Sequence, residues 1–565
     1  MILGIDLGTT NSLICYLKQG VPVAIPNAAG KFLTPSVVGV DDDVMLVGAA
    51  ARERLYKFPQ LTSHSFKRLM GSKQSVRLGG KQYSPEDLSA LVLRALKADA
   101  EIYLGTEVKD VVISVPAYFN ESQRRATKVA GELAGLNVRQ LINEPTAAAL
   151  FHGIQDYETE AKFLIFDLGG GTFDVSILEK FEGVMEVRAT GGDSFLGGDD
   201  FTQVLVDLFG SKTELSAAQL HNPAIVSAIR FVAEDAKRNF SEQNQISMQV
   251  QVAGELKSAL ITLEEFETAC KGLLERLRTP IERALRDARL RVGDLDELVM
   301  VGGATRMGLI RKLVSQLFGR LPARYIDPDQ TIGLGTAVCA GLIAKDIAFN
   351  EIVLTDVCPH TLGTEVLDYD QQNQAIGLTF LPIIERNTIV PASRVQTVVT
   401  SNDGQTQLSI RVFQGESRDC SKNVLLETLE LDIPARPKGE ISAAIRYTYD
   451  INGMLEVDVD VENAGIHKNL VISKLAGTID AEEIAERRKV LAALKVHPRD
   501  QEENRYLLER GERLYEQFLG ERRDHVRLLL TQFIAVIEKQ DPLEILKARE
   551  AFLRALNSLD RGEVW

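Results

Sequence analysis

The chain has 565 residues, 45% of them hydrophobic and 25% charged, which suggests three or four globular domains and excludes a disordered or collagen-like chain. A net charge of −15, the lack of an apolar run of about 18 residues and an N-terminus without signal-peptide features disfavour nucleic-acid binding, membrane spanning and secretion. The five cysteines are scattered without a Cys-x-x-Cys pair, so we expect reduced thiols, no zinc site and a cytoplasmic protein.

The first block of the chain, residues 1–350, alternates short apolar runs with amphipathic stretches. Apolar runs predict buried strands at residues 111–115 and 163–166, and helical spacing predicts helices over 121–133 and 263–277. Alternating strands and helices are typical of α/β folds. We therefore expect an α/β domain here.

The second and third blocks differ from the first in their pattern of apolar and polar residues. Residues 408–412 and 455–461 alternate apolar and polar residues with period two, and an Asn-Gly turn dipeptide precedes the second run, so residues 356–476 predict an antiparallel β-domain. Residues 477–565 are helical in character. Within them Val526, Leu530, Phe533 and Ile537 recur at spacings of three and four, which places them on one helix face.

A short connector, residues 351–355 followed by Asp356, separates the first two blocks. It is partly apolar and contains neither glycine nor proline, whereas a passive linker would be rich in Gly, Ser or Pro. Two interpretations remain open: a connector that docks on a partner surface in at least one state, and an ordinary edge strand.

An approximate internal repeat is the most informative feature of the sequence. Residues 4–12 read Gly-Ile-Asp-Leu-Gly-Thr-Thr-Asn-Ser, and residues 166–176 read Phe-Asp-Leu-Gly-Gly-Gly-Thr-Phe-Asp-Val-Ser. In both copies an apolar strand ends in an aspartate, Asp6 or Asp167, and small residues with hydroxyls follow. One copy would favour a hairpin with a glycine turn, but two copies in the same context favour phosphate binding. Neither a P-loop nor a Gly-x-Gly-x-x-Gly motif is present.

The chemistry of this repeat is specific. Glycines allow a tight turn and leave room for a ligand beside the backbone, and successive N–H groups in such a turn form an anion-binding nest. A carboxylate repels phosphate and would therefore act through a metal ion, usually by way of metal-bound water. Two such loops facing each other would hold a polyphosphate and its Mg²⁺ from both sides.

Two further stretches fit a nucleotide cleft. Gly303 follows an apolar strand, where it would let a flat base approach the backbone, and Arg306 is placed to stack on that base. The second stretch is a helix face suited to ribose hydroxyls and ring nitrogens, formed by Glu234, Lys237, Arg238 and Ser241. Without its neighbours, that face would be better interpreted as a solvated charged surface.

Two stretches of small residues predict helices that pack tightly on each other. They cover residues 142–150, with Glu144 at the helix entrance, and residues 333–337.

Taken in chain order, these motifs resemble those of the DnaK-type (heat shock protein 70) chaperones, and the short form of the chain resembles the HscC-like branch. The motifs that carry the resemblance lie at residues 5–12, 115–120, 143–149, 167–174, 301–306 and 414–416. The resemblance implies a multidomain α/β + β + α chain. Its parts would be an actin-like two-lobed ATPase domain with ribonuclease H-like lobes (1–350), a linker (351–355), an antiparallel β-sandwich peptide-binding domain (356–476) and a helical lid (477–565).

The resemblance also implies roles for individual residues. Implied catalytic residues are Asp6, Lys67, Glu144, Asp167 and Thr172, with Lys67 and Thr172 beside the γ-phosphate. Asp6, Asp167 and Asp174 are implied to hold Mg²⁺, mostly through water, and K⁺ is a further candidate ion. ATP or ADP would be bound by Gly8, Thr9, Thr10, Asn11, Gly169, Gly170, Gly171, Thr172, Glu234, Lys237, Arg238, Ser241, Gly303, Arg306 and Asp329.

The implied function is an ATP-dependent chaperone that binds and releases extended hydrophobic segments of unfolded or client polypeptides, with hydrolysis coupled to peptide affinity. Implied peptide-binding residues are Thr364, Leu367, Val398, Ser401, Leu408 and Ile410. Implied interdomain coupling residues are Pro116, Arg124, Val353, Leu354 and Asp356. The implied partners are client polypeptides and a J-domain co-chaperone, with no nucleic acid and no membrane.

The sequence departs from the family pattern at several positions. Thr355 puts a polar residue in the linker, which predicts weaker docking. Gln140 stands where an arginine commonly engages J-domain proteins. Thr364 and Ser401 change the apolar peptide pocket, and the short segment 241–261 leaves open whether a nucleotide-exchange factor is needed.

Two alternatives use the same phosphate loops. A sugar or metabolite kinase of the actin-like ATPase superfamily, or a polymerising actin-like protein, would explain the first block. Neither explains the β-domain and the helical tail.

Overall fold

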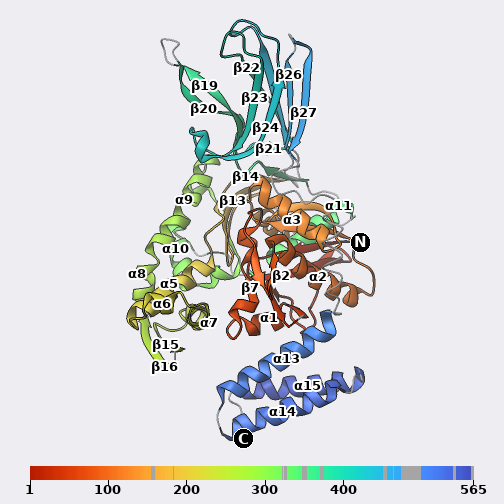
Figure 1. Cartoon of the computed structure of the whole chain (residues 1–565), viewed down its shortest axis with the longest axis vertical. Helices are drawn as coiled ribbons and strands as arrows, with labels where there is room; N and C mark the ends of the chain where they lie inside the picture. The colour runs from red at the N-terminus through yellow and green to blue at the C-terminus, as the bar shows by residue number, and fades with distance from the viewer. Residues whose placement is uncertain are drawn as a thin grey trace.

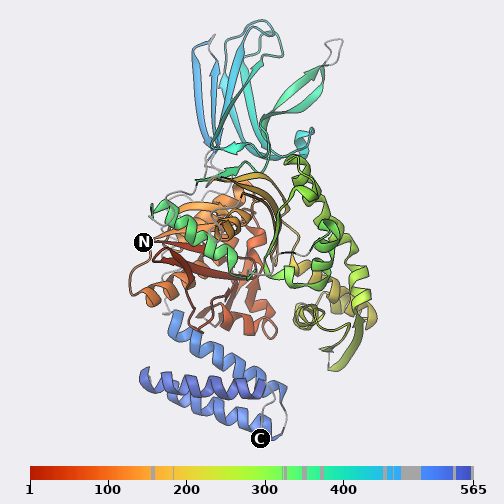
Figure 2. The ribbon, with the colours of Figure 1, turned by 180° about the vertical axis from the view of Figure 1, so that it is seen from behind.

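The computed structural model describes residues 1–42, 44–153, 160–181, 184–252, 254–320, 322, 327–346, 353–369, 375–449, 455–461, 464–472, 498–518, 520–538 and 542–560. Two α/β lobes lie at the centre, a β-domain lies at one end, and three helices lie at the other (Figures 1 and 2). The fold class predicted from the sequence is confirmed. No helix within these ranges is both long enough and apolar enough to cross a membrane.

The first lobe is built on a sheet with the strand order β11-β10-β1-β2-β3, and β4 also pairs with β2. Its elements are β1 (Ile2–Asp6), β2 (Asn11–Lys18), β3 (Val21–Ala24), β4 (Thr34–Pro35), β5 (Val37–Asp41), β6 (Val44–Val47), α1 (Ala49–Arg54), η1 (Pro59–Leu61), β7 (Thr62–His64), η2 (Phe66–Leu69), β8 (Val76–Leu78), β9 (Lys81–Tyr83), α2 (Pro85–Leu104), β10 (Asp110–Val115), α3 (Glu121–Leu133) and β11 (Asn137–Asn143). The predicted helix over 121–133 has these bounds because Asn120 and Gln123 form a capping box at its start.

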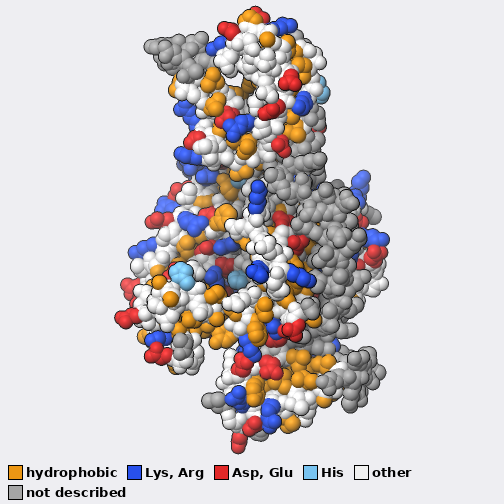
Figure 3. Space-filling view, in the orientation of Figure 1, with side chains coloured by type: hydrophobic (Ala, Val, Ile, Leu, Met, Phe, Trp, Pro, Cys, Tyr) orange, Lys and Arg blue, Asp and Glu red, His pale blue; other side chains and the backbone are white. Residues whose placement is uncertain are grey.

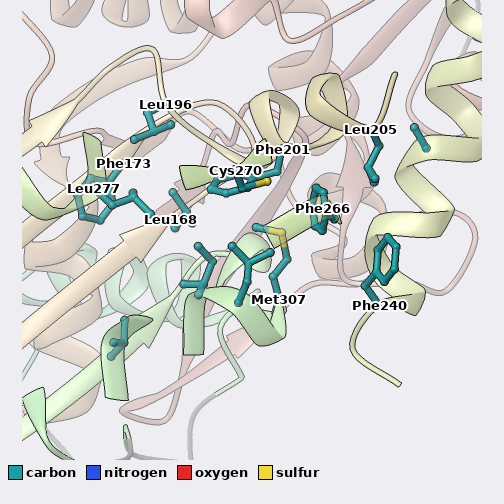
Figure 4. Close-up of a cluster of buried hydrophobic side chains, with 14 of the residues drawn as sticks. Leu168, Phe173, Leu196, Phe201, Leu205, Phe240, Phe266, Cys270, Leu277 and Met307 are labelled. Carbon is teal, nitrogen blue, oxygen red and sulfur yellow. The ribbon is translucent and has the colours of Figure 1, made fainter. Parts of the chain in front are cut away.

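The second lobe repeats this plan on a sheet with the order β17-β12-β13-β14, which continues through β18 and β21. Its elements are β12 (Ala161–Leu168), β13 (Phe173–Phe181), β14 (Val184–Asp193), α5 (Gly198–Lys212), α6 (Ala217–Leu220), α7 (Pro223–Asn239), β15 (Gln245–Val252), β16 (Glu255–Thr262), α8 (Leu263–Ala269), α9 (Lys271–Asp287), η3 (Val292–Asp294), β17 (Glu297–Val301), η4 (Gly303–Arg306) and α10 (Gly308–Phe318). Figure 4 shows part of the apolar core of this lobe, in which Leu168 and Phe173, on either side of the second glycine loop, are fully buried.

One helix prediction is wrong in this lobe. The helix expected over 263–277 is two helices, α8 and α9, which meet at Cys270. A capping box from Thr262 to Glu265 starts α8, and Cys270 both ends α8 and precedes α9. Apolar spacing continues across the break, so periodicity alone could not reveal it.

Two helices of small residues lie between the sheets of the lobes, α4 (Glu144–Gly153) and α11 (Thr331–Ile343), and their side chains share one core with both sheets. The predicted tight packing of these helices is confirmed. A Cβ placed on Gly335 would lie only 1.8 Å from the carbonyl oxygen of Ala147, so the helices can approach this closely only with glycine there.

The β-domain consists of two four-stranded antiparallel sheets, β20-β19-β23-β24 and β22-β25-β26-β27. Its elements are β18 (Val353–Val357), β19 (Leu362–Tyr369), β20 (Ala375–Ile384), β21 (Ile389–Val390), β22 (Ala392–Val399), β23 (Gln407–Gln414), η6 (Cys420–Lys422), β24 (Val424–Asp432), β25 (Ser442–Tyr449), β26 (Leu455–Val461) and β27 (Ile466–Ile472). Alternating residues of β26 are buried, as the period-two pattern predicted.

The C-terminal helices are α13 (Pro498–Gln517), α14 (Glu521–Glu538) and α15 (Pro542–Asp560). The predicted apolar face of α14 is confirmed, because Val526, Leu530 and Phe533 are buried in a core shared by the three helices and Ile537 packs against it. Helix α13 lies against α1 of the first lobe (Figure 1). The predicted domain boundaries at 350/351 and 476/477 lie outside the described residues.

The connector forms a strand that joins two parts of the molecule. Val353–Val357 make up β18, whose first three residues pair in parallel with β14 and whose last two pair with β21 of the β-domain. Residues 353–355 thus dock on the second lobe by adding a strand to its sheet, in which β18 lies between β14 and β21.

Candidate functional site

The two glycine-rich loops of the internal repeat lie opposite each other. Each connects two antiparallel strands, β1 to β2 and β12 to β13. A Cβ placed on Gly170 would lie 1.8 Å from Thr10 Oγ1, and one on Gly171 would lie 2.6 Å from Thr9 Cγ2. Glycine is therefore required for the loops to approach this closely, and the predicted facing arrangement is present in the structure.

Backbone hydrogen bonds fix the second loop on the start of α5. Gly198 N donates to the carbonyl oxygen of Gly169 at 2.9 Å, and Asp199 N donates to that of Gly170 at 2.8 Å. The Gly169 N–H in turn donates to the carbonyl oxygen of Thr172 at 3.1 Å, and the Thr172 side chain is buried. In the first loop, Gly8 N donates to Ser12 Oγ at 3.2 Å. The loops are thus positioned by the elements around them.

Buried charged residues gather beside the loops. Asp6 ends β1, Asp167 and Asp174 face each other across β12 and β13, and Glu144 begins α4. Lys67, from η2, donates to Glu144 Oε1 at 2.6 Å, with its side chain only 3% exposed. The structure brings all five together from five separate elements, and the single ammonium group of Lys67 faces four carboxylates.

This excess of carboxylates raises their proton affinities. Burial, followed by the negative charge of Glu144, raises the pKa of Asp6 to about 7 and that of Asp174 to about 8. The same two causes raise the pKa of Asp167 well above its usual range. Asp167 Oδ2 is buried and has no hydrogen-bond partner. Such a site favours an added positive charge.

The residues therefore fit a phosphate chain and its cation. The facing loops offer hydroxyls and backbone N–H groups to phosphate, and the buried Asp167 oxygen without a hydrogen-bond partner suits water bound to a hard cation. Within the described ranges, no three acidic, histidine or cysteine side chains are close enough to form a direct metal site. Binding of the cation through water is the arrangement that this donor set allows.

The residues expected to line an adenosine pocket lie in the second lobe. Lys237 Nζ donates to the carbonyl oxygen of Gly198 and to Thr202 Oγ1, each at 2.9 Å, and forms an ion pair of 2.6 Å with Glu234. Burial alone would raise the pKa of Glu234, but Lys237, Thr202 and Arg238 lower it. These contacts connect α7 to the start of α5, and hence to the second glycine loop.

Other members of this group are more exposed. Arg306 donates to Asp329 Oδ2 at 2.7 Å, and Gly303 lies against the same carboxylate. Arg238 is exposed and pairs with Glu234. Ser241 lies beyond the last residue of α7, where its hydroxyl bonds the carbonyl oxygen of Arg238. The predicted single helix face therefore holds for three of its four residues.

Sequence reasoning missed residues that connect the lobes at the site. Arg68 Nε donates to the carbonyl oxygen of Gly171 at 2.9 Å, and its guanidinium pairs with Asp200. Ser65 Oγ donates to Asp199 Oδ2 at 2.6 Å. The position of Arg68 next to Lys67 was the only signal in the sequence, since its partners lie more than one hundred residues away.

A hydrogen-bonded chain leads from this site to the connector. Asn143, which precedes Glu144, donates from Nδ2 to Asp356 Oδ2 at 2.8 Å, and Thr146 Oγ1 donates to the same oxygen at 3.2 Å. The buried Arg124 guanidinium donates to Asn143 Oδ1 and, at 3.2 Å, to the carbonyl oxygen of Ala117. Asn143 thereby connects Arg124 and Asp356, two of the residues for which the resemblance implies a coupling role. Leu354 packs against the core between the lobes.

The loop that begins at Pro116 makes a second connection. Tyr118 N donates to Asp174 Oδ1 at 3.0 Å, and the carbonyl oxygen of Tyr118 contacts His360 Nε2 of the β-domain at 3.1 Å. The two rings lie edge to face at 4.3 Å, and burial lowers the pKa of His360 to about 4, so the imidazole is neutral near pH 7 and donates this hydrogen bond. One residue thus contacts both a carboxylate of the site and the β-domain.

The β-domain is also held against the second lobe by charge. Arg386 pairs with Asp287 through Nε at 2.8 Å and Nη2 at 3.1 Å, and Asn387 Nδ2 donates to the same carboxylate at 3.0 Å. This fork of two donors is strong and directional.

The expected peptide-binding residues differ in burial and lie on β19, β22, β23 and the segment after β22. Strand β19 pairs with β23 only over Leu362–Thr364, so Leu367 lies on the part of the β19–β20 hairpin that diverges from β23 (Figure 1). Thr364 and Ile410 are buried, with Thr364 Oγ1 donating to the carbonyl oxygen of Arg411 at 2.9 Å. Val398, Ser401, Leu408 and Leu367 are partly exposed.

The surface bears no large patch of one charge on the face that Figure 3 shows. Lys and Arg side chains are interspersed there with Asp and Glu side chains. The net charge of −15 is therefore not concentrated on this face.

Comparisons with known proteins agree with this geometry. The family model described as "Hsp70 protein" matches residues 2–77 and 73–541. Chaperone protein DnaK of Thermotoga petrophila is 40% identical over 486 residues, which cover 84% of this chain and 80% of that protein. Chaperone protein DnaK of Thermosipho melanesiensis is 40% identical over 485 residues, with the same coverage of both chains.

Proposed function

The chain belongs to the Hsp70 family, and we propose that its ATPase reaction takes place where the two glycine-rich loops meet. It is an ATP-dependent molecular chaperone and an ATPase that binds ATP and ADP, and its partners are client polypeptides and co-chaperones. Membership of this family rules out the sugar-kinase and filament alternatives. The observation that carries the residue-level proposal is the buried group of Asp6, Asp167 and Asp174 beside two facing glycine-rich loops.

In this proposal the two loops hold the phosphate chain through their N–H groups and through the hydroxyls of Thr9, Thr10 and Thr172. The three aspartates hold Mg²⁺ mostly through water, and K⁺ is a second candidate ion. Bound Mg²⁺ would neutralise phosphate charge. Lys67 is placed to contact the γ-phosphate, and Glu144 positions both Lys67 and the attacking water. Phosphoryl transfer depends mainly on such positioning and charge neutralisation.

We propose that α7 and η4 form the adenosine pocket. Lys237 supports this assignment because it connects the pocket wall to the loop that would hold the phosphates. The remaining members of this pocket would be Glu234, Arg238, Ser241, Gly303, Arg306 and Asp329. Gly8, Asn11, Gly169, Gly170 and Gly171 would instead complete the two phosphate-binding loops.

We also propose that peptide affinity is coupled to this site through β18. Asn143 and Glu144 are consecutive residues, one bonded to the connector and the other to Lys67, which supports a short route between nucleotide and linker. Pro116, Arg124, Val353, Leu354 and Asp356 are the proposed coupling residues. The peptide-binding residues would be those assigned from the sequence, brought together when the β19–β20 hairpin closes on β23.

We propose the branch of the family, the co-chaperone and the cellular location from single features of the chain. An HscC-like branch fits the short hairpin β15–β16 in the segment 241–261. We propose a J-domain partner, with Gln140 on edge strand β11 altering that contact, and leave the exchange factor open. A cytoplasmic location fits the five cysteines, all of them buried free thiols. We retain the domain boundaries 1–350, 351–355, 356–476 and 477–565.

The substitution Thr172→Ala tests the proposed site. It removes a γ-phosphate contact and no adenosine contact, so we expect at least a tenfold loss of single-turnover ATP hydrolysis with little change in the Kd for ATP. Thr127→Ala is the matched control, because Thr127 is also a buried threonine but lies in α3, away from the loops. Equal turnover in the two variants would contradict the assignment of the second loop.

A further inference from the structure

Two buried serines of the first lobe hold the backbone of the first glycine-rich loop. Ser12 lies in β2, which follows the loop, and Ser36 lies between β4 and β5. Only 0% of Ser12 and 1% of Ser36 is exposed, so neither hydroxyl reaches solvent. Ser36 Oγ donates to the carbonyl oxygen of Gly8 at 2.7 Å, and Ser36 N donates to that of Thr10 at 2.9 Å.

The hydrogen bonds around Gly8 form a closed ring with one direction, called here the serine ring. The Gly8 N–H can only donate, so Ser12 Oγ accepts from it at 3.2 Å. The Gly8 carbonyl oxygen can only accept, so it takes the single proton of the Ser36 hydroxyl. Ser36 Oγ must therefore accept in the hydrogen bond of 2.9 Å between the two hydroxyls, and Ser12 donates it. Both polar backbone groups of Gly8 are thus engaged by buried hydroxyls.

The second glycine-rich loop has the same carbonyl oxygens engaged, but by different donors. Gly169 occupies the position of Gly8 in the internal repeat, and its carbonyl oxygen accepts from the first backbone N–H of α5 at 2.9 Å. Gly171 occupies the position of Thr10, and its carbonyl oxygen accepts from a guanidinium N–H at 2.9 Å. The first loop therefore obtains from one serine what the second obtains from a helix start and an arginine.

The direction of these carbonyl oxygens decides which groups the loop presents. In a trans peptide, the carbonyl oxygen of one residue and the N–H of the next point in opposite directions. Since the Gly8 and Thr10 carbonyl oxygens point towards Ser36, the N–H groups of Thr9 and Asn11 point away from it. If the Gly8 peptide were not held, it could turn its carbonyl oxygen to the other side, where the oxygen would repel an anion.

We propose that Ser12 and Ser36 are positioning residues, which fix the Gly8 peptide so that the first loop presents N–H groups and not carbonyl oxygens to the phosphate chain. This role rests on the proposed nucleotide site, whose phosphate affinity it would set. The two hydroxyls are not equivalent. Loss of the Ser36 hydroxyl frees a carbonyl oxygen, which repels phosphate, whereas loss of the Ser12 hydroxyl frees an N–H, which does not.

The test measures the affinity of the full chain for ADP and for ATP, each with Mg²⁺, by calorimetry. We expect Ser36→Ala to weaken binding of both nucleotides by roughly tenfold or more, and Ser12→Ala to weaken it by no more than about threefold. Ser89→Ala is the matched control, because Ser89 is a fully buried serine of the same lobe whose hydroxyl contacts Met70 Sδ. It should bind both nucleotides as the unaltered chain does.

Thermal unfolding without nucleotide separates positioning from a purely structural role. Each alanine variant removes one hydroxyl of the same ring, so both should unfold at similarly lowered temperatures, and a structural role would weaken nucleotide binding equally in the two. If Ser36→Ala does not fold, Ser36→Cys takes its place, because a thiol is only a weak donor and should shift the affinity in the same direction.

Two results would overturn the role of the serine ring. One is an equal loss of ADP affinity in Ser36→Ala and Ser12→Ala, and the other is a Ser36→Ala affinity within about twofold of that of Ser89→Ala. If neither nucleotide binds the unaltered chain, the proposed nucleotide site is wrong. If both bind and Thr172→Ala slows hydrolysis, but Ser36→Ala binds them like the control, the serine ring alone is refuted.

Discussion

Asp356 offers the sharpest test of coupling between the nucleotide site and the β-domain. Its Oδ2 accepts hydrogen bonds from Asn143 at 2.8 Å and from Thr146 at 3.2 Å, both in the first block of the chain. The substitution Asp356→Ala removes both bonds but leaves every proposed ATP-binding residue in place. We expect the docked form of β18 to lose stability, while the residues that are proposed to bind ATP are unchanged.

The size of the effect follows from these two bonds. A hydrogen bond to a charged group contributes about 1.5–3 kcal/mol, and the longer Thr146 bond contributes less, so the loss should be roughly 2–4 kcal/mol. Since every 1.4 kcal/mol is about tenfold, the docking equilibrium should fall by roughly 30- to 1,000-fold. Peptide affinity should then respond little to ATP, because the form that weakens peptide binding is hardly populated.

The assay is fluorescence anisotropy of a labelled, extended apolar peptide, titrated with the chain in ATP and in ADP. The ratio of the peptide Kd in ATP to the peptide Kd in ADP should fall towards one in Asp356→Ala. The Kd for ATP in the absence of peptide should be unchanged. Thr355→Val is a paired variant that we expect to shift the docking equilibrium of β18 in the opposite direction. Thr355 Oγ1 is buried without a hydrogen-bond partner, so replacing it with a methyl group should strengthen docking by about 1–3 kcal/mol and weaken peptide binding in ADP. A wild-type Kd ratio in Asp356→Ala would refute the proposed route.

Three further predictions concern the site and the lid. The raised pKa values of Asp6 and Asp174 mean that the folded, nucleotide-free lobes hold extra protons. The stability that these two groups contribute is therefore fully present below about pH 4 and is lost as the pH rises towards about 8, by about 1.4 kcal/mol per pH unit for each group. Asp174→Asn should flatten this decline in urea titrations at pH 5–8 while abolishing ATP turnover, and an unchanged slope would contradict it. Gly170→Ala should lower ATP affinity at least tenfold in calorimetry because its Cβ would lie 1.8 Å from Thr10 Oγ1, whereas Gly293→Ala, at an exposed position in η3 with open space around it, should leave binding intact. Phe533→Ala should destabilise the three-helix core by about 3–5 kcal/mol, read as earlier thermal unfolding of the helices, and Leu528→Ala on the exposed face of α14 should not.

Repeats and periodicity predicted the parts of this fold that depend on local pattern. The two Asp-Leu-Gly loops were expected to face each other, and they do, because each ends a central strand of a similarly built lobe. The face of α14 and the alternation of β26 followed from spacing alone. The break between α8 and α9 did not, since apolar residues continue across Cys270.

Contacts between distant segments could not be predicted in the same way. Nothing near Arg54 in the sequence indicates that its partner is Glu509, and nothing near Tyr118 indicates that it contacts His360. These are single contacts between surfaces, formed only once whole elements are in place. The resemblance supplied the proposed roles of Lys67 and Glu144, but not their direct ion pair of 2.6 Å.

The junction of β11 and α4 offers a route by which a change at the two glycine-rich loops would be transmitted to the connector. Asn143 and Glu144 lie at the junction of β11 and α4, so a shift of Glu144 towards or away from Lys67 moves the amide that holds Asp356. Tyr118 bonds Asp174 through its N–H and His360 through its carbonyl oxygen, so the peptide backbone itself connects the two. Side-chain rotation cannot absorb a displacement that passes through the backbone. We therefore expect a change of charge at the buried carboxylates to reach the connector and the β-domain through these two short routes.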